Sequence, residues 1–209
     1  MPKPQLVVLG ASGNALDALD ALQAGHEIVA FLDDDPARHG ETINGVAIRP
    51  RAVLGDYPEA EVVALIGSEK SFARREEIIA GFGVPAERFA TIVHPRAHVS
   101  RQATLGRGTV VLAGATIPSN ARLGDHVLVL PNTVIHHDAM IEDFSIIGAG
   151  VIIAGHVRIG KSSYVGSGST IRNGITLGTK SLVGMAANVT KSFGGSVVLV
   201  GNPAREMKR

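Results

Sequence analysis

The chain has 209 residues, a formal net charge of +1 and no cysteine. The near-zero charge gives no electrostatic basis for binding nucleic acid or an anionic membrane surface. The lack of cysteine excludes disulfides, thiol nucleophiles and zinc–thiolate sites. Apolar residues make up 45% of the chain but aromatic residues only 4%, which favours a core of stacked aliphatic side chains. No signal peptide follows Met1 and no apolar run approaches the roughly 20 residues of a membrane span, so we expect a cytoplasmic protein.

The first part of the chain alternates between apolar runs and helical patterns. Residues 5–10 form an apolar run typical of a buried parallel strand, and a glycine turn and leucines at helical spacing follow it. Further strands are predicted over 28–32 and 61–67, and a charged helix over 71–82. A strand, a glycine turn and a helix make the first half of a Rossmann-like unit. We therefore predict an α/β domain over residues 1–91.

Glycine, serine and acidic residues follow three of the predicted strands. The carboxyl ends of parallel strands meet at one edge of a sheet, where ligands of open α/β sheets bind. A glycine turn at a helix N-terminus also favours an anion such as a pyrophosphate. The turn alone is a weak signal, since its glycine spacing is not the full dinucleotide fingerprint and an ordinary strand-to-helix turn looks similar. The candidate nucleotide-site residues are Gly10, Ser12, Gly13, Asn14, Asp33, Asp34, Gly67 and Ser68.

From Val93 to Val189 every sixth residue is aliphatic, without a slip of register. The positions are Val93, Val99, Leu105, Val111, Ile117, Leu123, Val129, Ile135, Ile141, Ile147, Ile153, Ile159, Val165, Ile171, Leu177, Val183 and Val189. A period of six fits neither a helix nor an alternating strand. It is the period of a β-solenoid in which each short strand ends at a corner.

Two further registers support the solenoid. The position four after each aliphatic residue is usually Ala, Ser or Thr, as expected where walls meet at a tight corner. The position directly after it is often glycine, and we expect these glycines to supply the positive φ that corners require.

The repeat resembles the left-handed parallel β-helix of hexapeptide acyltransferases, in which three hexapeptides form one coil of about 18 residues. A Rossmann-like domain followed by such a helix is similar to the bacterial nucleotide-amino-sugar acetyltransferases. The bacillosamine, perosamine and sialic-acid acetyltransferases belong to this group. The resemblance implies a β-helix acyltransferase domain over 92–209 and a nucleotide-sugar bound by the N-terminal domain. It also implies a homotrimer with acetyl-CoA in the groove between adjacent helices.

One cluster interrupts the plain repeat, at His136, His137 and Asp138. Acyl transfer to an amine needs a base, and histidine titrates near neutral pH, while an adjacent carboxylate orients its ring. The other reading is a pair of exposed imidazoles on a solenoid wall. The family's catalytic histidine and acidic neighbour correspond to His137 and Asp138, and His136 is the rival. The family's asparagine seven residues before the base and histidine nine after it are replaced by Leu130 and Ile146.

The 18-residue coil also predicts which residues lie beside this cluster. His156 stacks with Asp138, and Gly155 lies in the column of His137, where we expect it to let pantetheine approach the backbone. Residues 201–205 resemble the closing Gly-x-Pro-Ala-Arg segment of the family, beside the adenine end of coenzyme A. The coenzyme residues that the resemblance implies are Gly155, His156, Ser167, Met185, Ala186 and Pro203.

These features predict an acetyl-CoA-dependent N-acetyltransferase that acts on a nucleotide-linked amino sugar of the 4-amino-4,6-dideoxy type for surface glycan synthesis. No metal is expected. Sugar O-acetylation and a non-catalytic nucleotide-sugar-binding protein are the alternatives. A γ-type carbonic anhydrase shares the β-helix but places zinc histidines five residues apart, where this chain has Ile141 and Glu142. Its ligand set is therefore incomplete.

Overall fold

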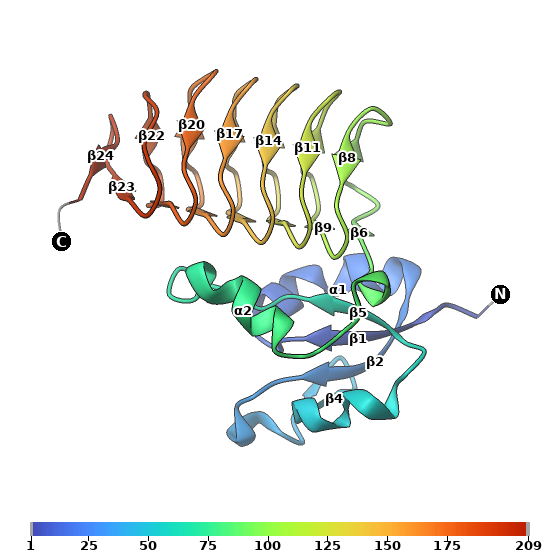
Figure 1. Ribbon diagram of the computed structural model, residues 1–209. Coiled ribbons are helices and arrows are strands. Elements are labelled where there is room, and N and C mark those ends of the chain that lie inside the picture. Colours follow the sequence, from blue (N-terminus) through green and yellow to red (C-terminus); the bar gives the residue numbers. More distant parts are fainter. Residues whose placement is uncertain (1, 208–209) are drawn as a thin grey trace.

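The computed structural model describes residues 2–207, which form an α/β part (residues 2–91) followed by a long β-helix (residues 92–207), as Figure 1 shows. The α/β part holds a five-stranded sheet in the order β3-β4-β2-β1-β5, parallel except for β3. Its elements are β1 (Gln5–Leu9), α1 (Gly13–Gly25), β2 (Glu27–Leu32), η1 (Pro36–Arg38), β3 (Thr42–Ile43), β4 (Val46–Arg49), η2 (Arg51–Asp56), β5 (Glu61–Ala64), η3 (Phe72–Arg74), α2 (Arg75–Ala80) and η4 (Ala86–Arg88). No helix among the described residues is both long and apolar enough to cross a bilayer.

Two local features of the α/β part differ from the expectation. The helix predicted over 71–82 is shorter, because it begins as the 3-10 turn η3 and ends at Ala80, before Gly83 adopts a φ of +64°. The β3–β4 hairpin was not predicted. It turns at Asn44-Gly45, both at positive φ, which is the sequence signal for a tight hairpin.

The predicted parallel β-helix is confirmed. Each short strand pairs in parallel with the strand one coil of 18 residues further on, as Arg122 pairs with Met140 and Met140 with Arg158. One wall, the β13 sheet, contains β7 (His98–Val99), β10 (Thr116–Ile117), β13 (Val134–Ile135), β16 (Ile152–Ile153), β19 (Thr170–Ile171) and β22 (Asn188–Val189). A second wall, the β14 sheet, contains β8 (Thr104–Leu105), β11 (Arg122–Leu123), β14 (Met140–Ile141), β17 (Arg158–Ile159) and β20 (Thr176–Leu177).

The third wall, the covered sheet, faces the α/β part. Its strands are β6 (Ile92–Val93), β9 (Val110–Val111), β12 (Leu128–Val129), β15 (Ile146–Ile147), β18 (Tyr164–Val165), β21 (Leu182–Val183), β23 (Val198–Val200) and the antiparallel β24 (Arg205–Glu206). Outward side chains of this sheet, such as Leu128 and Ile146, share one buried cluster with Leu6 and Val8 of β1. The two parts of the chain therefore pack through a common apolar core, and the corner between the other two walls faces away from it.

The period-six aliphatic residues fill the prism, and small residues occupy the corners as predicted. Buried hydroxyls there bond to backbone carbonyls, as Ser163 Oγ donates to the carbonyl of Gly160 over 2.6 Å. The glycine expectation is wrong, because positive φ falls two positions after those glycines, as at Ser162 after Gly160. The glycines are needed for space instead. A Cβ at Gly160 would lie 2.5 Å from the backbone nitrogen of Thr179 on the next coil.

Candidate active site

His137 and Asp138 lie at the corner of the β-helix between β13 and β14, on the side away from the covered sheet. We call this the His137 corner, and it includes Asn120, Gly155 and His156 from the coils on either side. Asp138 and His156 both have φ near +60°, as does Asn120. Each therefore projects from the same turn of successive coils, and their side chains form one column.

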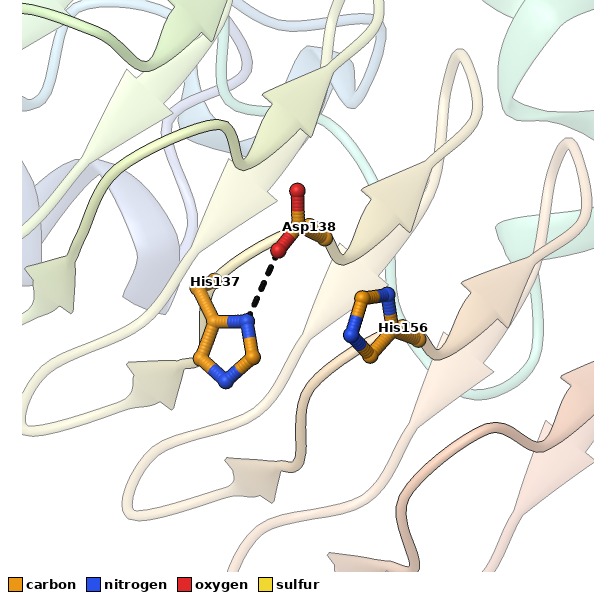
Figure 2. Close-up of side chains that lie close together, drawn as sticks. All are labelled: His137, Asp138 and His156. Atoms are coloured by element: carbon orange, nitrogen blue, oxygen red, sulfur yellow. Dashed lines mark hydrogen bonds and ion pairs between the residues drawn. The ribbon is translucent and has the colours of Figure 1, made fainter.

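The imidazole of His137 is hydrogen-bonded to the carboxylate of Asp138, with 2.8 Å between Nδ1 and Oδ2 (Figure 2). This hydrogen bond, with a smaller contribution from Asn120, holds the pKa of the Asp138 carboxyl below its usual range. The ionised carboxylate thus accepts a hydrogen bond from Nδ1–H. That tautomer leaves the lone pair of Nε2 free to accept a proton from another molecule.

His136 lacks this arrangement. Its ring is exposed, and no side-chain hydrogen bond of His136 is present within residues 2–207. Its backbone nitrogen donates to the carbonyl of Ile153, one coil away, within the wall of the prism. Of the two adjacent histidines, only His137 has a carboxylate partner that orients its ring.

Gly155 lies against the ring of His137, as the 18-residue coil predicts. A Cβ on Gly155 would lie 2.9 Å from Cε1 and 3.0 Å from Nε2 of His137. The ring itself therefore occupies the space that the glycine leaves open. An approach of pantetheine to the backbone near Gly155 stays a prediction.

His156 stands beside both residues of the pair. Its ring meets that of His137 edge to face at a centroid distance of 5.2 Å (Figure 2). Ligand atoms of His137, Asp138 and His156 all lie within 4.8 Å of one another, and this is the one group in the described part of the chain with the geometry to hold a metal ion. All three side chains are exposed, and Nδ1 of His137 is already hydrogen-bonded to Asp138.

Three polar residues at this corner were not predicted. Asn120, Arg122 and Arg158 line a cavity of about 450 Å³ together with Asp138 and His156. The coil arithmetic that placed His156 beside Asp138 also places Asn120 there, one coil earlier. The arginines follow two residues after Asn120 and His156, at the start of strands of the β14 sheet.

A second cavity, of about 440 Å³, lies at the carboxyl edge of the α/β sheet. Six of the eight candidate nucleotide-site residues line it, namely Gly10, Ser12, Asp33, Asp34, Gly67 and Ser68. Leu32, Ile66, Ile78 and Phe82 provide an apolar wall, and Ser71 adds a hydroxyl. The structure therefore gathers residues from three strand ends around one space of a size that suits a small ligand.

The other two candidates do not line this cavity. Gly13 opens α1, and a Cβ there would meet nothing within 4 Å. Asn14 joins two strand ends instead, because its Nδ2 donates to the carbonyls of Leu65 and Gly67 over 3.2 and 2.9 Å. Its amide thus fixes the shape of the cavity from behind.

The two aspartates of the cavity are held by different partners. Asp33 Oδ2 accepts from the backbone nitrogen of Ala11 in the glycine turn over 3.1 Å. Asp34 forms a bidentate pair with Arg51, at 2.7 and 2.8 Å, and the Arg51 guanidinium lies 4.2 Å from the centroid of the Phe82 ring. The acidic strand end and the aromatic wall are therefore fixed to each other.

The candidate coenzyme residues fall in separate places on the β-helix. Gly155 and His156 belong to the His137 corner, whereas Ser167, Met185 and Ala186 lie at the corner between the covered sheet and the β13 sheet. Ser167 Oγ accepts from the backbone nitrogen of Ala149, and Met185 is 73% exposed. The segment with Pro203 lies beside Asn188, which bonds to Gly201 and Ala204. One chain does not bring these groups into a single site.

Similarities to known proteins extend over the whole chain. The family described as the GMPPB C-terminal domain matches residues 89–192, the β-helix. The acetyltransferase domain of PglB from Neisseria gonorrhoeae, solved in complex with acetyl coenzyme A, is 28% identical, with a TM-score of 0.84 over 98% of this chain and 100% of that one. No curated protein sequence matches the chain.

Two more distant structures share the fold. Perosamine N-acetyltransferase from Caulobacter crescentus, in complex with CoA and GDP-perosamine, is 24% identical, with a TM-score of 0.87 over 98% of this chain and 97% of that one. WeeI from Acinetobacter baumannii is 22% identical, with a TM-score of 0.84 over 98% of this chain and 100% of its own. In its α/β part and its β-helix the chain is therefore similar to the hexapeptide-repeat amino-sugar acetyltransferases, among them the PglB domain at 27–28% identity.

Proposed function

We propose that the protein is an acetyl-CoA-dependent N-acetyltransferase that acts on a nucleotide-linked amino sugar, of the 4-amino-4,6-dideoxy type. The observation that carries the proposal is the hydrogen-bonded pair of His137 and Asp138 at an exposed corner of a β-helix. A PglB domain of the same fold was solved with acetyl coenzyme A, and the Caulobacter enzyme with CoA and GDP-perosamine. The nucleotide sugar is proposed to bind at the cavity of the α/β part, and the acetyl thioester beside the His137 corner.

In this mechanism Nε2 of His137 accepts a proton from the amino group of the sugar as its nitrogen attacks the thioester carbonyl. Asp138 keeps the ring oriented and stabilises the imidazolium that forms. The tetrahedral intermediate collapses with cleavage of the carbon–sulfur bond, and the proton on His137 passes to the departing thiolate. The acetyl group is transferred directly, so no acyl-enzyme forms.

The α/β part, residues 1–91, is proposed to be a Rossmann-like domain that binds the nucleotide of the acceptor, with a left-handed β-helix domain over 92–209. Ser12 offers a sharp test, because it lines the cavity yet makes no side-chain capping bond to α1. Ser12→Leu should raise KM for the acceptor and leave KM for acetyl-CoA unchanged. A rise in KM for acetyl-CoA alone would mean that the two sites are exchanged.

The protein is proposed to act as a homotrimer. The cavity of the α/β part lies on the side of the covered sheet, whereas the His137 corner points away from it, and the candidate coenzyme residues are divided between two corners. A neighbouring copy joins these surfaces into one site. Light scattering should give about three times the 21.7 kDa chain mass. A monomer with full activity would contradict a shared site.

One assay separates this function from its alternatives. Purified protein is given acetyl-CoA and a panel of UDP-, GDP- and dTDP-linked amino and hydroxy sugars, and release of CoA is followed. Turnover with an amino sugar supports N-acetylation, and turnover only with hydroxy sugars supports O-acetylation. Tight binding of a nucleotide sugar without any turnover would support a non-catalytic binding protein.

A further inference from the structure

Two arginines flank the His137 corner on the β14 sheet, and neither has a role in the mechanism above. We propose that Arg122 and Arg158 form a phosphoryl-binding subsite, which holds a phosphate or diphosphate group of a substrate beside His137 and Asp138. The choice of substrate rests on the proposed function. The affinity of the subsite for the phosphoryl group does not.

The strand register places the two guanidinium groups on one side of a single cavity. Arg122 pairs with Met140 and Met140 with Arg158, so the three side chains form a row on successive coils. Neighbouring strands lie about 4.8 Å apart, which separates the two arginine backbones by about twice that distance. Met140 lies between them, with its sulfur 3.6 Å from Nη1 of Arg158. The row lines the cavity of about 450 Å³ that also contains Asn120, Asp138 and His156.

Both guanidinium groups are available for a ligand. Neither Arg122 nor Arg158 forms an ion pair with a carboxylate of residues 2–207. Some other arginines are engaged in ion pairs, as Arg51 is with Asp34 and Arg74 with Glu77. Two exposed guanidinium groups without an ion pair, beside one cavity, are suited to an anion that accepts several hydrogen bonds. Phosphoryl oxygens match the planar arrangement of N–H donors in a guanidinium group.

One carboxylate, that of Asp138, also faces the cavity and would repel an anion. Hydrogen-bond donors partly compensate its negative charge, because Oδ2 accepts the hydrogen bond of His137 and the side chain of Asn120 also stabilises the carboxylate. His156 and the amide of Asn120 add hydrogen-bond donors on the same side. The balance of groups around the cavity therefore favours an anion beside the arginines.

The proposed reaction brings phosphoryl groups to this place from either of two substrates. A nucleotide-linked sugar carries its diphosphate on the anomeric carbon, one sugar ring away from the amino group that His137 deprotonates. Coenzyme A carries a diphosphate and a 3′-phosphate. The chemistry of the subsite is the same in both cases, and kinetics with each substrate distinguish them.

Isothermal titration with inorganic pyrophosphate tests the subsite without any turnover. Arg122→Gln and Arg158→Gln should each weaken binding about tenfold, the loss expected for one charge-assisted contact. Arg158→Lys keeps the charge but loses the fork, so it should restore only part of the affinity. Arg107→Gln is the matched control, because it removes the same charge at an exposed arginine of a different corner. Equal affinity in all variants, or no binding to the unaltered protein, would overturn the proposal.

Steady-state kinetics with the same variants identify the source of the phosphoryl group. If it belongs to the acceptor, KM for the nucleotide sugar rises about tenfold while KM for acetyl-CoA is unchanged. If it belongs to coenzyme A, KM for acetyl-CoA rises, and comparison with 3′-dephospho-acetyl-CoA shows which phosphate is held. Unchanged KM values for both substrates would contradict a role in catalysis. If the arginine variants lose pyrophosphate binding but the unaltered protein has no transferase activity, the proposed function is refuted and the subsite is supported.

Discussion

The imidazole of His137 occupies the space in which a side chain at position 155 would lie, with its Cε1 2.9 Å from a Cβ placed on Gly155. Gly155 does not need glycine for its backbone conformation, because its φ is not positive. The glycine thus leaves room on one coil for the proposed base of the coil before it.

Gly155→Ala is therefore expected to displace the ring of His137 and to lower kcat about 10- to 100-fold, since small errors in the position of a base are costly. The melting temperature should change little, because the contact is with a side chain at an exposed corner. Gly55→Ala is the control, as a Cβ there meets nothing within 4 Å. Unchanged kcat in Gly155→Ala would show that His137 does not need its present position.

Asp138 is expected to contribute through its charge as well as its hydrogen bond. Asp138→Asn keeps an oxygen that can accept from Nδ1 of His137 but removes the charge that stabilises the imidazolium. We expect kcat to fall about tenfold, while KM for acetyl-CoA is maintained. Saturating both substrates isolates this effect. A fall in kcat/KM with normal kcat would assign Asp138 to substrate binding instead.

The two parts of the chain are joined by a buried arginine. Arg75 is fully buried and donates to the carbonyls of Ile66 and Ala64, over 2.7 and 3.1 Å, and to the carbonyl of His126 on the β-helix. Arg75→Ala leaves these carbonyls without a donor and should lower the free energy of unfolding by about 3 kcal/mol. Chemical denaturation measures the change.

Arg74 provides the matched control for this substitution. It precedes Arg75 in the chain, but its side chain is 70% exposed and pairs only with Glu77. Arg74→Ala should therefore have no measurable effect on unfolding. Equal effects of the two substitutions would contradict the assignment of Arg75 to the interface.

His126 is expected to make stability depend on pH. Its ring packs between Phe89 and Phe144, at centroid distances of 4.5 and 5.0 Å. Burial, aided by the charge of Arg75 and opposed by Asp125 and Asp143, lowers the pKa of His126 to about 4. The unfolded chain therefore binds the proton first as the pH falls.

This contribution to stability is complete above the unfolded pKa near 6.5 and is lost as the pH falls towards 4, by about 3 kcal/mol. Denaturation of the protein and of His126→Phe across that range measures it, because the variant lacks the titrating group but keeps the aromatic packing. The loss of unfolding free energy over this pH range should be smaller in the variant by this amount. Equal slopes would contradict a neutral, buried His126.

Much of the β-helix and its corner follows from the sequence, because an 18-residue coil places any residue beside those one coil before and after it. That arithmetic places His156 beside Asp138 and Gly155 beside His137. The contacts between the two parts of the chain could not be predicted in this way. Arg75 sits in a charged helical stretch that reads as exposed, and its burial depends on carbonyls at residues 64, 66 and 126 that come together only in the folded chain.

Some contacts had a sequence signal that the period of six conceals. Val110, Leu128 and Ile146 each precede an aliphatic residue of the repeat and recur every 18 residues, which marks one wall of the prism as covered. The same spacing places Arg122 and Arg158 on another wall. It also places Ser167 and Met185 at one corner and Gly155 at another, so the division of the candidate coenzyme residues follows from the same spacing.

The central claim is that His137, and not His136, accepts the proton during acyl transfer. The most direct test is kcat for His137→Ala and His136→Ala at saturating acetyl-CoA and acceptor, with light scattering to show that assembly is unchanged. His137→Ala should lose about 10²–10⁴-fold in kcat, the usual contribution of a general base, and His136→Ala much less. Near-normal kcat in His137→Ala, with the loss appearing in His136→Ala or His156→Ala, would contradict the account.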